Sequence, residues 1–406
     1  MQSIPQSVVA MLPELLIALA LLGMLAQALE LTLPAVLMRN LAIAMIALAI
    51  FLAVLRGERL GGGNGLPLAL ALFALWISVR VVYEDGAQPV PLLLAMWLPF
   101  TFFAAYTSRA AGQRVAAIFC VFTAVAATLY LSTTLSIGLR GGLLINAIFY
   151  VILGLPFILA IQSRTMRMAG ILVIVTAAAA SNKRTAIVAL SVALFMYLLT
   201  ENRRSKPATT LRFRPGLAAG GLILAVITPY WVGLRVFGVD ILAKFADAGQ
   251  DGGSGRAEIY SWVWKRLGEA SANRLFFGHG TNAVAQETGG FSAHNDFLEV
   301  AYDYGLVGFG LYLFVYACLI ATLIKLVSSR NRYAGAWAAS LGLFATLSSL
   351  SHLALIPTYV ALLAVFWGYI LRETADSTGS IDGSSVRHNG VRRHYASPPR
   401  RKSIHG

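Results

Sequence analysis

The chain has 406 residues, of which 58% are hydrophobic and only 12% are charged, and its mean hydropathy is +0.71. A soluble globular domain carries roughly a quarter charged residues, so this composition excludes that class and predicts a protein with many membrane spans. A net charge of +14 would suit nucleic-acid binding, but the positions of the basic residues along the chain give another explanation.

Apolar segments long enough to cross a bilayer recur along most of the chain. A spanning helix needs about 20 predominantly apolar residues. On that template the sequence predicts an all-α integral membrane protein with about 12 transmembrane helices, at 7–28, 38–55, 66–83, 91–107, 115–137, 142–161, 167–181, 185–200, 216–238, 297–327, 334–350 and 353–371. The first run has no basic segment before it and no cleavage site, which favours a retained helix over a signal peptide.

The basic residues indicate the orientation. When alternate loops are placed on opposite sides, with the amino terminus inside, most of the 32 Lys and Arg residues fall on the inner side. This is the positive-inside bias of membrane proteins, so both termini are predicted to be cytoplasmic and no nucleic-acid partner is needed. The basic segment 372–406 is rich in Ser and Gly and is predicted to be a disordered cytoplasmic tail near lipid headgroups.

One long external loop, 239–296, separates the spans in 1–238 from those in 297–371. Loops of this length without a role are uncommon. It contains the glycine-rich stretch GQDGGSG at 249–255 and then the segment 256–272, in which apolar residues share one helical face. We expect an amphipathic helix there, lying on the outer surface of the membrane.

External basic residues are candidates for anion binding, because the positive-inside rule does not explain them. The candidates are Arg80, Arg140, Lys183, Arg184, Arg235 and Arg256. A cation at membrane depth costs about 2.5–3.5 kcal/mol, so it is expected to face a polar cavity or an anion. A guanidinium can also bind a phosphate through two hydrogen bonds. The alternative for each is a helix-end side chain that reaches the membrane surface.

His294 and Asn295 stand at the boundary between the long loop and the tenth predicted span. A histidine titrates near neutral pH, so His294 is a candidate general base. Asn295 is a candidate helix cap or ligand for a substrate hydroxyl. Glu299 and Asp303 share one helical face, and one of them could orient His294.

Other residues in this region favour structural interpretations. Gly305 and Gly308 are expected to allow close helix packing. His279, between two glycines, is expected to be a turn residue, and His352 is a possible cavity residue without an identifiable partner. The sequence has no Asp-x-Asp, no cluster of His and Cys, and no Walker loop, so it predicts no metal and no nucleotide or other cofactor.

Four motifs resemble the O-antigen ligase and polymerase superfamily. They are Ser181-x-x-Arg184-Thr185, Gly255-Arg256, Gly278-x-Gly280, and His294-Asn295 followed after nine residues by Gly305-x-x-Gly308. The resemblance covers about 175–315. It implies a GT-C-like, inverting glycosyltransferase of the bacterial inner membrane, which uses neither metal nor nucleotide sugar.

The resemblance also implies substrates and residue roles. The donor would be a glycan on undecaprenyl diphosphate and, for a ligase, the acceptor would be the lipid A-core oligosaccharide at the periplasmic face. His294 would be the general base, and Arg184 and Arg256 would bind the donor diphosphate.

Three other functions stay open at this point. A polymerase of O-antigen or exopolysaccharide shares the motifs and the donor, whereas protein O-glycosylases usually have a longer carboxy-terminal extension. The single long loop favours a ligase. A transporter of lipid-linked glycans also suits twelve spans. However, transporters usually place polar residues at the membrane midplane and contain repeats, and here the candidates gather at one face without a repeat.

Overall fold

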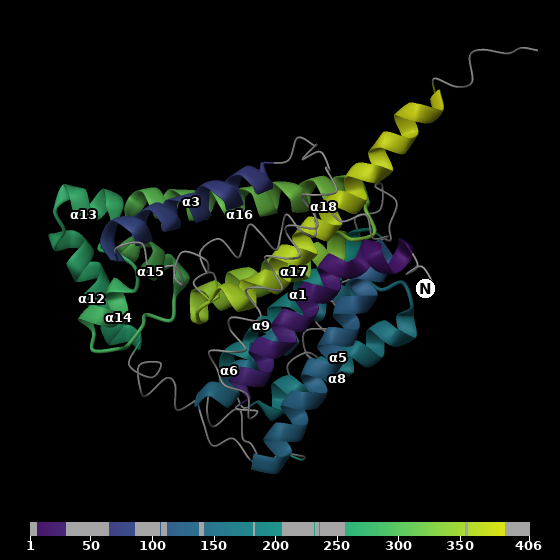
Figure 1. Cartoon of the computed structure of the whole chain (residues 1–406), viewed down its shortest axis with the longest axis horizontal. Helices are drawn as coiled ribbons and strands as arrows, with labels where there is room; N and C mark the ends of the chain where they lie inside the picture. The colour runs from purple at the N-terminus through teal and green to yellow at the C-terminus, as the bar shows by residue number, and fades with distance from the viewer. Residues whose placement is uncertain are drawn as a thin grey trace, which may run out of the picture.

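The computed structural model describes residues 6–29, 65–85, 106, 112–137, 142–181, 183–204, 231, 235, 256–353 and 356–385. Within these residues the chain is helical and contains no β-strand (Figure 1). The predicted span at 38–55, almost all of the spans at 91–107 and 216–238, the stretch 249–255 and Arg140 lie outside the described residues.

The helices, in chain order, are α1 (Gln6–Ala28), α3 (Leu66–Asp85), α5 (Gly112–Ile137), α6 (Gly142–Ile152), α7 (Leu155–Ala160), α8 (Arg164–Ala180), α9 (Arg184–Arg204), α12 (Arg256–Glu269), α13 (Ala272–Phe277), α14 (Ala283–Glu287), α15 (Asp296–Asp303), α16 (Gly305–Ser328), α17 (Ala334–Leu350) and α18 (Pro357–Ser385). Among the described residues, four helical segments are long and apolar enough to cross a membrane: Leu66–Tyr83, Arg114–Leu135, Arg184–Asn202 and Gly305–Ser328. Shorter apolar helices accompany them. The all-α class and the membrane character are thus supported.

Two predicted spans are broken in the structure. The span at 142–161 is divided into α6 and α7, because Pro156 lies at the start of α7 and has no backbone N–H to continue the preceding helix. The span at 297–327 is divided into α15 and α16 at Gly305, whose φ is +68°. Hydropathy misses both breaks, since the apolar composition continues through them.

Close antiparallel packing of α9 and α17 determines which ends of these two helices lie together. A Cβ on Gly342 would lie 3.3 Å from the Cα of Ala193, and one on Gly335 would lie 2.8 Å from Oε1 of Glu201. Small residues therefore let the two backbones approach, as in other membrane helix pairs. The beginning of α9 consequently lies near the end of α17.

A second pair, α3 and α16, runs side by side (Figure 1). Trp76 of α3 donates its indole N–H to the carbonyl of Tyr304 at 3.0 Å, just before α16 begins. Gly308 packs against the same indole, since a Cβ added at Gly308 would lie 3.1 Å from Nε1 of Trp76. The expectation that Gly308 permits close packing is confirmed.

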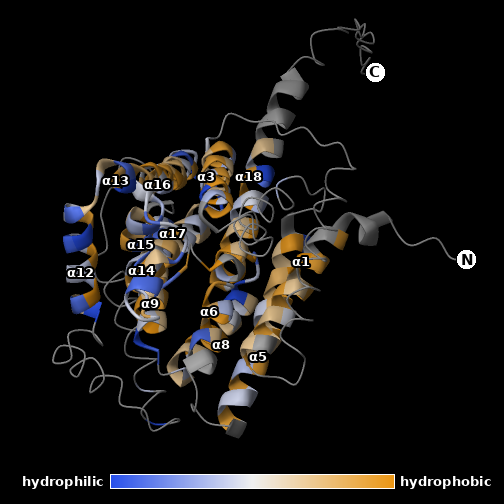
Figure 2. Ribbon diagram, turned by 60° about the vertical axis from the view of Figure 1, so that its left-hand side comes forward, coloured by the Kyte–Doolittle hydropathy of each residue, from blue (hydrophilic) through white to orange (hydrophobic). Residues whose placement is uncertain are grey.

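The loop helix α12 has an apolar and a polar side (Figure 2). It ends at Glu269, three residues before the predicted end. Val263 is fully buried, and Ile259 and Leu267 pack around it against a cluster that includes Leu298 and Tyr302 of α15. The amphipathic helix is confirmed, and part of its apolar side packs on α15. Its position on the outer surface of the membrane stays a prediction.

The final helix is longer than expected. α18 continues from Pro357 to Ser385 and so includes the first part of the predicted disordered tail. The sequence has no proline between Pro357 and Pro398, so nothing stops the helix from extending beyond its buried part. Residues 386–406 lie outside the described part of the chain.

Gly278 and Gly305 lie against each other at the point where α13 and α16 meet. Both have positive φ, +87° and +68°. A Cβ on Gly305 would lie 2.4 Å from the carbonyl oxygen of Phe276, and one on Gly278 would lie 2.2 Å from that of Asp303. Only glycine fits these positions without strain.

Replacing Gly305 by alanine should therefore destabilise the protein by about 1–3 kcal/mol, since the new Cβ meets backbone and the left-handed φ is strained. The measurement is the thermal unfolding midpoint of the purified protein in detergent. Gly310→Ala in the same helix is the matched control, because its Cβ meets nothing within 4 Å. Equal midpoints for the two variants would contradict the account.

Candidate functional site

The short helix α15 carries three carboxylates on one face. Asp296, Glu299 and Asp303 follow one another at helical spacing, and their exposed fractions are 0%, 4% and 3%. A buried carboxylate is costly unless hydrogen bonds satisfy it. Each of these three accepts hydrogen bonds from a different part of the chain, so α15 holds several segments together.

Asp303 holds the turn after α13. Its carboxylate accepts the backbone N–H of Asn282 at 3.0 Å and of Val284 at 3.2 Å. His279 stacks on Tyr302 with 4.0 Å between ring centroids, and its backbone N–H donates to the Tyr302 carbonyl. The interpretation of His279 as a turn residue is confirmed.

Glu299 and Asp296 bring the His294 loop beside the connection between α17 and α18. Glu299 accepts the backbone N–H of Ala293 through Oε1 and lies 3.1 Å from Nδ1 of His352 through Oε2. Asp296 accepts the backbone N–H of Leu353 at 3.0 Å. Two loops that are far apart in sequence are thus fixed against one helix.

His294 is held in an uncommon backbone conformation between these contacts. Its φ is +51°, in the left-handed region. Asn295, the next residue, caps α15 by accepting the N–H groups of Phe297 at 3.0 Å and Leu298 at 3.3 Å. The His294 ring packs on the ring of His352, with 4.7 Å between centroids and 50° between planes.

Two cations approach this pair from other elements. Arg256, the first residue of α12, donates to the carbonyl of Leu350 at the end of α17 at 2.9 Å. Lys183, just before α9, donates to the side chain of Asn146 and lies 5.3 Å from the ring centroid of Phe149. The antiparallel packing of α9 and α17 explains why a residue near 183 and residues near 350 come together.

The electrostatics connects these residues. The pKa of His294 is lowered to about 4 by burial first and then by the positive charges of His352, Arg256 and Lys183. The pKa of Lys183 is lowered to about 8 by burial and by Arg256. Neutral His294 therefore lies in the field of several positive charges, and an anion is the ligand that such charges favour.

His352 differs from His294. Burial, the largest influence, lowers its pKa, but the hydrogen bond and charge of Glu299 and the charge of Asp296 outweigh burial, and its pKa is raised above the usual value. The imidazole that lies against the carboxylates therefore holds its proton more tightly than the imidazole of His294.

The other predicted site residues lie as follows. Arg184 is half-buried at the first position of α9, next to Lys183. Arg80 is buried in α3, and its guanidinium donates to the carbonyl of Gly278 at 3.2 Å, which ties α3 to the turn after α13. The side chain of Asn295 is engaged in the cap of α15.

Sequence reasoning missed the role of His352 and of Asp296. His352 comes from a short connection with no motif around it, and only the fold places it beside Glu299 and His294. The helical spacing of Asp296, Glu299 and Asp303 was visible in the sequence and could have indicated a buried carboxylate face.

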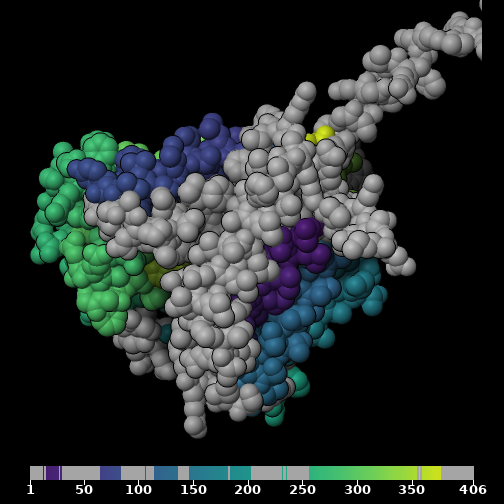
Figure 3. All heavy atoms as spheres, in the orientation of Figure 1, coloured from purple at the N-terminus to yellow at the C-terminus, as the bar shows by residue number. Residues whose placement is uncertain are grey.

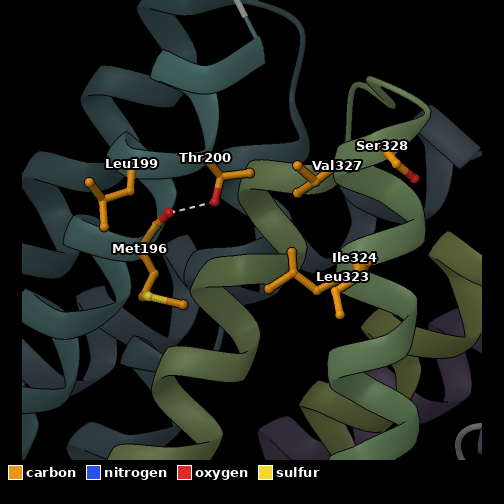
Figure 4. A pocket seen from close by; sticks show the side chains of 7 residues that line it. All are labelled: Met196, Leu199, Thr200, Leu323, Ile324, Val327 and Ser328. Carbon is orange, nitrogen blue, oxygen red and sulfur yellow. Dashed lines mark hydrogen bonds between the residues drawn. The ribbon is translucent and has the colours of Figure 1, made fainter. Parts of the chain in front are cut away.

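An apolar cavity of about 470 Å³ lies elsewhere, between α9 and α16. Figure 4 shows its lining by Met196, Leu199, Thr200, Leu323, Ile324, Val327 and Ser328. Met196 is thirteen residues along α9 from Lys183, which corresponds to about 20 Å at 1.5 Å per residue. The cavity is therefore separate from the His294 site.

The segment that begins at α12, green in Figure 3, forms one end of the molecule beside α3.

A comparison with curated proteins finds none that matches the chain. A comparison with protein families finds one for residues 169–313, roughly a third of the chain, and its description is O-antigen ligase. The matched segment contains Lys183, Arg256 and His294 and agrees with the extent of the resemblance inferred from the motifs. Over this segment the chain is similar to the O-antigen ligase family, and the similarity points to a function of the O-antigen ligase or polymerase type.

Proposed function

We propose that this protein is an O-antigen ligase of the bacterial inner membrane. It transfers O-antigen polysaccharide from undecaprenyl diphosphate to the lipid A-core oligosaccharide at the periplasmic face. The observation that carries the proposal is the contact of His294 with His352, two residues after the Leu350 whose carbonyl binds Arg256. His294 and Arg256 lie in the segment that matches the family, and the charge of Lys183 acts on the same group.

The reaction assigns a role to each group. His294 takes the proton from the acceptor hydroxyl as the hydroxyl oxygen bonds to the anomeric carbon of the donor sugar. The bond from that carbon to the diphosphate oxygen breaks, and undecaprenyl diphosphate leaves with the bonding electrons. Displacement from the opposite side inverts the anomeric centre. A neutral histidine can accept the proton, and the low pKa of His294 keeps it neutral.

Lys183 and Arg256 supply positive charge where the diphosphate develops negative charge. Fixed cations in a water-poor site stabilise a leaving group strongly, so the proposal needs no metal ion. Arg184, beside Lys183, is the further candidate for this role. Bound diphosphate would also offset the two cations that lower the pKa of His294, which makes His294 a stronger base in the substrate complex.

A polymerase of O-antigen or exopolysaccharide is the alternative within the same family. It would use the same donor and the same base with another acceptor. The residues that bind the donor do not distinguish the two, so the acceptor has to be tested directly.

The role of His294 can be tested in cells. In a ligase-null strain, the wild-type chain should restore long-chain lipopolysaccharide, and His294→Ala should restore none at equal membrane abundance, because the general base is lost. His279→Gln is the matched control, since it removes another loop histidine, whose ring stacks on Tyr302 and contacts the Tyr302 carbonyl through Nδ1. Restored chains with His294→Ala would contradict the role of His294. Activity only in a polymerase-null strain would identify the polymerase.

The pKa values of His294 and Lys183 predict how the activity depends on pH. His294 must be neutral and Lys183 charged, so kcat/KM for purified protein should fall below about pH 4 and again above about pH 8. Lys183→Arg should remove the alkaline fall, because a guanidinium keeps its charge. The acid limb of kcat should lie at higher pH than that of kcat/KM, since bound diphosphate raises the pKa of His294. An alkaline fall that persists in Lys183→Arg would contradict this assignment.

A conservative substitution tests the role of Arg256. Arg256→Lys keeps a charge but loses the planar pair of donors, so transfer should fall about tenfold or more if the diphosphate is bound bidentately. The assay is single-turnover transfer with saturating acceptor. Arg266→Lys on the same helix serves as control, because Arg266 stacks on Trp262 and has no place in the proposed site. Equal rates for both variants would contradict a bidentate contact.

A further inference from the structure

We propose that His352, which lies outside the segment matched by the family, is a positioning residue that fixes the imidazole of His294 for catalysis. The inference rests on the proposed function, because it takes His294 to be the general base. His352 comes from the connection between α17 and α18, whereas His294 precedes α15. The fold alone brings the two rings together.

Both nitrogens of His352 are engaged. Nδ1 lies 3.1 Å from Oε2 of Glu299 and 3.9 Å from Oδ1 of Asp296, and Nε2 contacts the hydroxyl of Ser292. Its side chain is 14% exposed. The His352 ring therefore cannot turn without breaking a contact with a buried carboxylate, so its orientation is fixed.

The contacts of the His294 backbone do not by themselves fix its imidazole. Its backbone is held on both sides, by the contact of Ala293 with Glu299 and by the cap that Asn295 forms on α15. These contacts hold the backbone but do not prevent the His294 side chain from rotating. The ring of His352, 4.7 Å away, packs on the imidazole and limits that rotation. One carboxylate, Glu299, thus anchors both the backbone beside His294 and the ring that lies against its imidazole.

The charge of His352 also changes the pH at which His294 protonates, and this change can be measured. The charged and titratable groups around His294 are His352 from the α17–α18 connection, Arg256 from α12 and Lys183 before α9, with Glu299 and Asp296 of α15 behind His352. A protonated His352 opposes protonation of His294. Replacing it by a neutral side chain removes this opposition, so His294 should protonate at higher pH.

The experiment compares His352→Phe and His352→Gln with wild type in purified, membrane-reconstituted protein. Loss of positioning should lower kcat by about 10- to 100-fold and leave the KM for the donor within about twofold. The acid limb of kcat/KM should move to higher pH in both variants. His279→Gln is the control for losing a histidine ring, and its acid limb should stay in place.

Three results would overturn the inference: wild-type kcat in both His352 variants, an unmoved acid limb, or a loss that follows only a lower unfolding midpoint. If both variants fail to fold, Ser292→Ala takes their place, because it removes only the contact at Nε2. It should give a smaller loss of kcat, and a wild-type kcat would then overturn the inference. Activity in His294→Ala would instead refute the proposed function. An inactive His294→Ala with fully active His352 variants would refute only this inference.

Discussion

The site depends on three buried carboxylates that α15 places on one face. An unsatisfied carboxylate in this position would cost several kcal/mol, so Asp296, Glu299 and Asp303 must keep their backbone and imidazole partners. Those partners come from the turn after α13, from the His294 loop and from the connection after α17. The need to satisfy the carboxylates therefore fixes where the loops lie, and with them His294.

Around this anchor, the helices bring cations to the same place. Antiparallel packing of α9 on α17 carries Lys183 to the end of α17, and Arg256 reaches the same end through the carbonyl of Leu350. His294 remains neutral among these charges. A neutral base next to cations is suited to a reaction in which a proton leaves a hydroxyl while an anionic group departs. This pairing is the physical basis of the proposed transfer reaction.

The sequence predicted the features that depend on local pattern. The membrane class follows from composition, α12 from its apolar spacing, and the close packing of Gly308 from its place in a motif. Breaks at Pro156 and Gly305 were not predicted, because an apolar count does not register the backbone geometry that divides a span.

The site was predictable in part, for a similar reason. His294, Arg256 and Lys183 were identified because their residue types are unusual at a membrane boundary. His352 was not, since its importance comes from packing against Glu299 after a long separation in sequence. Arg80 was a candidate for anion binding because it is an external cation, whereas in the structure its guanidinium donates to the carbonyl of Gly278 and ties α3 to that turn. Residue type and local position alone do not distinguish a cation of the candidate site from a cation that holds two segments together.

The most direct measurement is a structure of the protein bound to a lipid-linked glycan donor with a non-transferable linkage. The account predicts that the diphosphate lies between Lys183 and Arg256, and that His294 faces the side of the anomeric carbon opposite to it. An acceptor hydroxyl would then fit within about 3 Å of the imidazole. A diphosphate held away from both cations, or on the same side of that carbon as His294, would contradict the central claim.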